Sequence, residues 1–167
     1  MKLLDTHSDD KFIPYCYKWG TIEERWAIVQ GLMDTDGYVD KRGHCSFTTI
    51  SKQLAEDFQF IIRSLGGTAS ISVDTNSGYK KDGVFVKCAD AYTVAIKIKD
   101  TSKLFRLPRK IERCASFNGG VSEVARRIVS YRYIGKKDAR CIMVDSIKSL
   151  YMLQDFIVTH NSWLALY

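Results

Sequence analysis

The chain has 167 residues, 46% of them hydrophobic, and a formal net charge of +6, which allows one sizeable core or two small ones. Hydrophobic runs fall short of the roughly 20 residues of a membrane span and no signal peptide is evident, so we expect a cytoplasmic protein with no membrane partner. The five cysteines are scattered and include no CxxC pair, which disfavours a zinc site or a disulfide framework.

The first 114 residues show the patterns of a compact α+β unit. Thr21 is a suitable N-cap, and apolar side chains then recur at helical spacing as far as an Asp-Thr-Asp-Gly stop. The patterns predict a helix, two strands, a helix, two strands and a short helix, over residues 22–33, 38–39, 45–50, 52–65, 69–73, 92–98 and 102–105. We expect residues 74–90 to form a long polar loop.

A second module is expected after a linker. Residues 115–122 contain Asn118-Gly119-Gly120, which is typical of a break between domains. Residues 123–161 hold short β-rich runs separated by polar residues, at 125–133, 141–146, 149–153 and 156–159. The sequence therefore predicts two modules followed by a tail, 162–167.

Positive charge is concentrated across the predicted junction. Residues 97–140 contain thirteen Lys or Arg against four Asp or Glu, whereas the rest of the chain is slightly acidic. Such a stretch suits a polyanion such as double-stranded DNA, because contacts with phosphates supply most of the affinity of non-specific binding. A solvated basic surface explains the charge equally well, so charge alone assigns no function.

Three short motifs in the first module, VQGLMDTDG at 29–37, KFIP at 11–14 and LFRLPRK at 104–110, resemble those of LAGLIDADG homing endonucleases found inside inteins. Residues 29–37, VQGLMDTDG, resemble the LAGLIDADG motif itself. Residues 11–14, KFIP, resemble the KxIP stretch before it, and residues 104–110, LFRLPRK, resemble the element that closes the unit. The likeness spans most of residues 11–113 and implies a helix-strand-strand-helix-strand-strand-helix endonuclease unit.

The resemblance also implies roles for individual residues. Gly31 costs an apolar helix up to about 1 kcal/mol, and close packing of a second such helix would justify it. Asp36 is implied as the carboxylate that binds Mg²⁺ for phosphodiester hydrolysis, while Asp34 braces the helix end. Lys110 is implied as the basic residue that stabilises charge in the transition state.

Other interpretations of these residues are open. Taken alone, Asp34-Thr35-Asp36-Gly37 is better explained as an ordinary helix-ending turn, since Asp and Gly are common turn residues; the flanking motifs favour the endonuclease interpretation. Lys110 lies in a basic stretch and could be a phosphate contact, and Lys80, Lys81 and Lys87 are weaker rivals for the catalytic role. The chain holds only one acidic helix of this type, so we expect it to need a second copy of itself or a missing N-terminal half.

The second module resembles the C-terminal splicing segment of inteins, a Hint-type fold. The likeness runs from residue 126 to residue 161 and ends in Thr159-His160-Asn161, with Ser162 after it. By this resemblance, Asn161 cyclises on its own carbonyl, His160 assists as acid or base, and Ser162 accepts an acyl group. Cys141 stands where the family places an assisting Asp or Cys, although a buried small residue explains it as well.

Two features of this module limit the expectation. The family often has a second His where this chain has Tyr151, and splicing also needs an N-terminal half. We therefore expect an intein C-terminal portion that splices with a partner. The tail, 162–167, is then host sequence, and a Ser before an apolar run suits a P-loop ATPase host. The alternatives are a free-standing homodimeric LAGLIDADG endonuclease and a DNA-binding module without cleavage.

Overall fold

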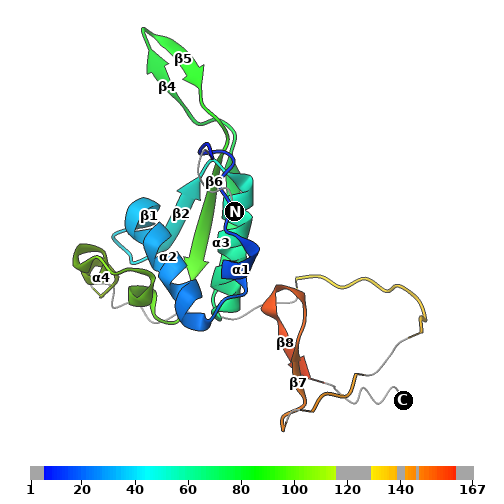
Figure 1. The fold of residues 1–167 in the computed structure, drawn as a ribbon. Helices are drawn as coiled ribbons and strands as arrows, with labels where there is room; N and C mark the ends of the chain where they lie inside the picture. The colour runs from blue at the N-terminus through cyan, green and yellow to red at the C-terminus, as the bar shows by residue number, and fades with distance from the viewer. Residues whose placement is uncertain (1–5, 116–128, 139–141, 146, 161–167) are drawn as a thin grey trace. The chain divides into compact units, whose positions relative to one another are not determined.

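The computed structural model describes residues 6–115, 129–138, 142–145 and 147–160 (Figure 1). The chain divides into two compact units, Met1–Val124 and Ala125–Tyr167, and each is described by itself below. None of the described helices is long and apolar enough to cross a membrane.

The first unit mixes helices and antiparallel strands in the α+β order that the sequence predicts. Its described helices are α1 (Tyr15–Lys18), α2 (Ile22–Asp36), α3 (Lys52–Ser64), the 3-10 helix η1 (Thr101–Leu104) and α4 (Pro108–Ala115). Its described strands are β1 (Gly37–Val39), β2 (Cys45–Thr49), β3 (Thr68–Asp74), β4 (Gly78–Lys81), β5 (Val84–Lys87) and β6 (Ala91–Lys97).

Helix α2 begins with a capping box. The Thr21 hydroxyl accepts from the Glu24 backbone N–H at 3.2 Å, and the Glu24 carboxylate accepts from the Thr21 N–H at 2.8 Å. Two of the first-turn donors that lack intrahelical partners are satisfied in this way. The helix then buries Val29 and Met33 completely and ends at Asp36, where β1 follows at once. The cap at Thr21 and the buried Val29 and Met33 therefore determine where the acidic end of the helix lies relative to the core.

Four of the strands form one antiparallel sheet in the order β1-β2-β6-β3. Because side chains alternate between the faces of a strand, the register decides which face each residue occupies. Phe47 on β2 lies opposite Val94 on β6, and Val94 lies opposite Ile71 on β3. Helices α2 and α3 cover this apolar face of the sheet (Figure 1).

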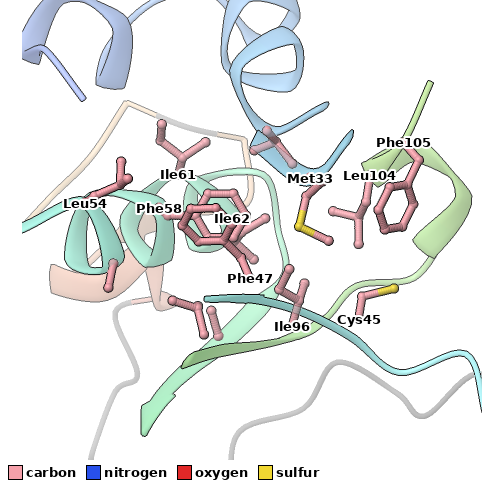
Figure 2. Packing of buried hydrophobic residues seen from close by; sticks show 14 of the residues in the cluster. Met33, Cys45, Phe47, Leu54, Phe58, Ile61, Ile62, Ile96, Leu104 and Phe105 are labelled. Atoms are coloured by element: carbon pink, nitrogen blue, oxygen red, sulfur yellow. The ribbon is translucent and has the colours of Figure 1, made fainter. Parts of the chain in front are cut away.

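The core lies between the sheet and the two helices. Phe47 and Phe58 pack with their ring centroids 4.6 Å apart, and both side chains are almost fully buried. Met33 of α2 lies near Leu104 and Phe105, beside the core that α3 fills (Figure 2). The acidic helix is therefore held to the sheet and to the segment before α4 by the same apolar cluster.

A buried carboxylate anchors the segment before α2. Asp57 on α3 is 3% exposed, and it accepts from the Ile13 backbone N–H at 2.8 Å and from Lys18 Nζ at 2.6 Å. The Ser51 hydroxyl donates to the Lys11 carbonyl oxygen at 2.5 Å. These bonds give residues 11–14, the KFIP stretch, a physical role, because they attach this segment to the start of α3.

The structure corrects the sequence prediction in three places of the first unit. Residues 74–90 are not a plain loop but contain the β4–β5 hairpin, which projects beyond the main sheet (Figure 1). Helix α4 begins at Pro108, so the unit does not end with the short helix at 101–104. A single helical turn, α1, precedes α2 where no helix was predicted.

The second unit contains little regular structure in its described residues. Strands β7 (Leu150–Met152) and β8 (Val158–His160) pair antiparallel, with the 3-10 helix η2 (Gln154–Phe156) between them. This pair agrees with the predicted strands at 149–153 and 156–159. The predictions at 125–133 and 141–146 are not confirmed, since residues 129–133 and 142–145 form no strand and the other positions lie outside the described residues.

Candidate active site

Three small residues lie along one exposed stripe of helix α2. Ala27, Gly31 and Thr35 recur every four residues, and all three are exposed. A Cβ atom added at Gly31 would meet no atom within 4 Å among the described residues. The Thr35 hydroxyl donates back to the Gly31 carbonyl oxygen at 3.1 Å, so it leaves no donor projecting from this face. The face is thus flat enough for a second backbone to approach closely.

Asp36 ends this helix with its side chain exposed. Its carboxylate makes no hydrogen bond or ion pair within the described part of the chain, so both oxygens are available. Gly37 follows it, and a Cβ atom there would lie 2.6 Å from the Met33 Cα and closer still to the Met33 carbonyl oxygen. Only glycine lets the chain leave the helix so tightly, and this turn sets the position of Asp36.

Asp34 has a different environment from Asp36, although the two are only two residues apart in the sequence. Its carboxylate accepts from the backbone N–H of Arg106 at 3.1 and 3.2 Å and from that of Leu107 at 3.2 Å. These donors lie just before α4, where the positive end of a helix favours a carboxylate. Asp34 therefore braces the site by joining α2 to α4, as the sequence suggested.

A second set of bonds runs beside the Asp34 contact. Arg106 Nε donates to the Gln30 side-chain oxygen at 2.7 Å, and Gln30 Nε2 donates to the Lys103 carbonyl oxygen at 3.0 Å. Gln30 occupies the second position of the VQGLMDTDG motif, and Arg106 lies in LFRLPRK. The two motifs are thus joined in space, and sequence reasoning missed both of these residues.

Lys110 lies in the first turn of α4, a helix that the sequence patterns did not predict. Its ammonium group donates to the carbonyl oxygens of Met33 at 2.7 Å, Asp34 at 2.9 Å and Gly37 at 2.7 Å. It also lies 5.5 Å from the centroid of the Phe105 ring. Burial and the neighbouring Arg109 lower the pKa of Lys110, while Asp34 and Asp36 oppose that shift.

The outer face of the main sheet carries hydroxyl groups in two rows across the strands. In one row Ser46 lies opposite Ala95, and Ala95 lies opposite Ser70. In the next row Thr48 and Thr93 are hydrogen-bonded through their hydroxyl groups at 3.0 Å, and Ser72 lies beyond Thr93. Hydroxyl groups can donate or accept, so this face can meet either kind of group on a polar partner.

The β4–β5 hairpin adds the cations that this face of the sheet largely lacks. Every residue of its two strands is exposed, and the strands carry Lys80, Lys81 and Lys87. Asp82 and Gly83 form its two-residue turn with positive φ values of 50° and 79°. The hairpin is therefore an exposed, mainly basic arm next to a neutral, hydroxyl-rich sheet.

The acidic end of α2 offers one available carboxylate for a metal, that of Asp36, rather than a full set of ligands. They contain no group of three or more His, Cys, Asp or Glu side chains placed to hold an ion. Carboxylate oxygen is the ligand type that Mg²⁺ prefers, so Asp36 suits it chemically. Asp34 is engaged by backbone N–H groups, so further ligands would have to come from another acidic helix, from water or from DNA.

The predicted splicing residues are only partly covered by the structure. His160 ends β8, and its backbone lies opposite Leu150. Cys141, Asn161 and Ser162 lie outside the described residues. Tyr151, at the position where inteins often have His, lies opposite Thr159 in the same strand pair.

A family model described as a LAGLIDADG-like domain matches residues 23–106 of this chain. The chain belongs to the LAGLIDADG-like domain family. The matched LAGLIDADG-like region covers α2, the main sheet, α3, the hairpin and η1. LAGLIDADG proteins are generally DNA endonucleases that use a divalent metal and often dimerise.

The chain is also similar to a longer curated protein. A replicative DNA helicase DnaB of Mycobacterium intracellulare is 33% identical over 161 residues. That alignment covers 94% of this chain but only 27% of the helicase. The likeness therefore extends beyond the LAGLIDADG-like region into the second unit.

Proposed function

We propose that the first unit is one half of a homing endonuclease that hydrolyses double-stranded DNA with a divalent metal held at Asp36. The observation that carries this proposal is the geometry of α2, which places an unengaged carboxylate at the end of a helix whose open face is lined by small residues. The family match supplies the class of reaction. Asp36 directly precedes β1 of the main sheet, and DNA would lie on the hydroxyl-lined outer face of that sheet.

A second acidic helix completes the site in this proposal. The Ala27–Gly31–Thr35 face is exposed and offers no obstacle to a neighbouring backbone, as small residues do at close helix contacts. The partner is either a second copy of this chain or another segment carrying its own acidic helix. Either would bring a second carboxylate next to Asp36, which the described residues do not provide.

Different parts of the proposed DNA surface would contact the bases and the phosphates. Serine and threonine hydroxyl groups on the sheet can contact base edges, and the lysines of the hairpin can contact phosphates. The sheet itself is nearly neutral, so electrostatic attraction comes mainly from the hairpin and from the basic residues near α4. This arrangement suits a duplex that crosses the sheet and continues beneath the hairpin.

The chemistry expected at Asp36 is hydrolysis of one phosphodiester. A water oxygen attacks phosphorus, one P–O bond breaks, and the leaving oxygen takes up a proton. Mg²⁺, when bound, would supply a Lewis acid that stabilises the attacking and leaving oxygens. Asp36 would hold the ion with a carboxylate oxygen, and the Gly37 turn would hold Asp36.

The test compares DNA cleavage with DNA binding. A duplex carrying the host gene without the inserted segment is incubated with Mg²⁺ and the protein, together with its partner half if one exists. We expect Asp36→Asn to lose cleavage while retaining binding in a gel-shift assay, and Glu23→Gln, at the other end of the same helix, to retain both. Undiminished cleavage by Asp36→Asn would refute the metal role. Binding without cleavage by the native protein would favour a DNA-binding module.

A second candidate function is protein splicing by the end of the chain. Its specific support is the alignment to the helicase, which covers 94% of this chain and so includes the second unit. An intein inserted in a helicase, which would be the host P-loop ATPase, explains why a LAGLIDADG-like region is similar to part of such a protein. The sequence Thr159-His160-Asn161-Ser162 fits the downstream junction of such an insertion.

The splicing chemistry can be tested without knowing the partner. The Asn161 side-chain nitrogen would attack its own backbone carbonyl, close a succinimide and release Ser162 as a free amine, with His160 as the proton donor. We attach a passenger protein after Tyr167 and follow its release by mass spectrometry. Release that Asn161→Ala abolishes supports the proposal, and release that persists in that variant would contradict it. A free-standing endonuclease would show no release at all.

A further inference from the structure

Lys110 has used every hydrogen-bond donor that it possesses. An ammonium group has three N–H donors, and here each faces one carbonyl oxygen, those of Met33, Asp34 and Gly37, at 2.7 to 2.9 Å. A DNA phosphate or an attacking water could take one of these donors only if a bond to the backbone were broken. The geometry therefore does not match a lysine that is poised for direct contact with the reacting groups.

The three acceptors lie on both sides of Asp36. Met33 and Asp34 belong to the last turn of α2, where the Met33 carbonyl oxygen also accepts from the Gly37 N–H, and Gly37 is the first residue of β1. Helix α2 has no basic residue of its own in its last turn, although a cation is favourable there. Lys110 supplies that cation from α4 and ties together the backbone before and after Asp36.

Helices α2 and α4 each supply a charged side chain that interacts with the end of the other. Asp34 of α2 accepts the N–H groups of Arg106 and Leu107 just before α4, which has no acidic residue in its own first turn. Lys110 of α4 donates to the carbonyl groups at the end of α2. Each helix thus receives from the other the charge that its own terminus favours, and the turn carrying Asp36 lies between these contacts.

We infer that Lys110 is a positioning residue that fixes the backbone of the Asp36 turn rather than a catalytic group that contacts DNA. The consequence for cleavage rests on the proposed nuclease function, whereas the effect on the turn itself does not. Without Lys110 the Asp36 carboxylate would sample more positions, and a metal would bind it more weakly. Reaction at a saturated metal site would be much less affected.

The first measurement is amide hydrogen exchange at Gly37, whose N–H donates to the Met33 carbonyl oxygen at the end of the helix. We expect Lys110→Met to speed this exchange at least about tenfold, because three charge-assisted bonds are lost. Arg109→Met is the matched control, since it removes a neighbouring exposed charge that makes no bond to α2 in the described residues. It should leave the exchange rate unchanged.

The second measurement is the dependence of DNA cleavage on Mg²⁺ concentration. We expect Lys110→Met to raise the Mg²⁺ concentration for half-maximal rate severalfold and to regain most of the rate at saturation. Unchanged Gly37 exchange, together with cleavage lost at every Mg²⁺ concentration, would overturn the inference and make Lys110 catalytic. If Lys110→Met does not fold, Lys110→Arg serves: it keeps the charge, but its planar group cannot converge on three carbonyls, so partial loss of protection is expected and full protection contradicts the inference.

These outcomes are separable from the fate of the nuclease proposal. Hydrogen exchange reports the Asp36 turn in the absence of DNA and metal. If the native protein cleaves no DNA, faster Gly37 exchange in Lys110→Met still supports the positioning role, and unchanged exchange still refutes it.

Discussion

The end of helix α2 and the β4–β5 hairpin belong to the same unit, yet they are held in opposite ways. At the end of α2, backbone and side chains are tied to α4 by hydrogen bonds from Arg106, Leu107 and Lys110. In the hairpin every strand residue is exposed, and the two strands pair only with each other. The end of α2 together with residues 106–110, called the corner below, therefore has a fixed geometry. The hairpin is an exposed arm that is available to contact a partner.

The difference also predicts which substitutions change the free energy of unfolding. Bonds to charged groups in the corner replace interactions with water, so losing one costs folding free energy. Exposed lysines in the arm gain little from folding, and their contribution appears only when a polyanion is present. Substitutions in the corner should therefore change stability and catalysis, whereas those in the arm should change binding alone.

Gly37→Ala should have the largest effect on the corner. The added Cβ would collide with the backbone of Met33, which cannot move without unwinding the last turn of α2. We expect a loss of about 3 kcal/mol in the free energy of unfolding, typical of strong overpacking, measured by urea denaturation. A loss below about 1 kcal/mol would show that the helix end is softer than the structure indicates.

Asp34→Ala should have the next largest effect, and Asp36→Ala is its matched control. Removing the Asp34 carboxylate leaves the N–H groups of Arg106 and Leu107 without their acceptor, which we expect to cost about 1–2 kcal/mol. Asp36 makes no such bond in the described residues, so its substitution should change stability by less than about 0.5 kcal/mol. Equal effects in urea denaturation would contradict the division of roles between the two carboxylates.

Gly31→Ala should act in the opposite direction on the isolated chain. Alanine is the better helix former, and its Cβ would meet open space, so we expect a gain of about 0.5–1 kcal/mol in stability. The same methyl group should weaken association with a second acidic helix, because that partner is proposed to pack against this face. Analytical ultracentrifugation measures the second effect. Unchanged association would move the partner to another surface.

How far the sequence predicted these regions depends on where their determinants lie. The signals for α2 are local, namely Thr21 with its first-turn glutamates and the apolar spacing, so the helix and its start were predicted correctly. Its end was not, because the helix continues through Asp36 instead of stopping at residue 33. The hairpin had a local signal as well, the Asp82-Gly83 dipeptide with the apolar run Val84-Phe85-Val86 after it, but the polar residues around this short run obscured the signal. Hydrophobic periodicity finds strands that are half buried, and these strands are not.

The sequence carries weaker local signals for helix α4 than for α2. Pro108 is favourable at the first position of a helix, but no capping side chain precedes it. The carboxylate at its start is that of Asp34, which accepts from the Leu107 N–H just before the helix. Asp34 lies more than seventy residues earlier in the chain, so no local pattern reveals this contact. The role of Lys110 was obscured for the same reason. Its type and its motif were visible, whereas its three acceptors depend on how α4 meets α2.

Replacing the hairpin lysines should have the smallest effect on stability and should test the arm directly. We expect Lys80, Lys81 and Lys87, all changed to Gln, to leave the free energy of unfolding within about 0.5 kcal/mol of the native value. DNA affinity should fall. The slope of log affinity against log salt concentration should decrease by about 0.9 for each lysine that contacts a phosphate.

The salt slope separates a DNA arm from a merely solvated one. If the three lysines contact phosphates, the slope falls by up to about 3, and the site of cleavage is unchanged because the sheet still reads the bases. Lys52→Gln is the control, since Lys52 lies on α3, which covers the opposite face of the sheet. An unchanged slope in the triple variant would place the phosphate contacts on the basic residues near α4. The hairpin would then need a partner other than DNA to explain its exposed aromatic residues, Tyr79 and Phe85.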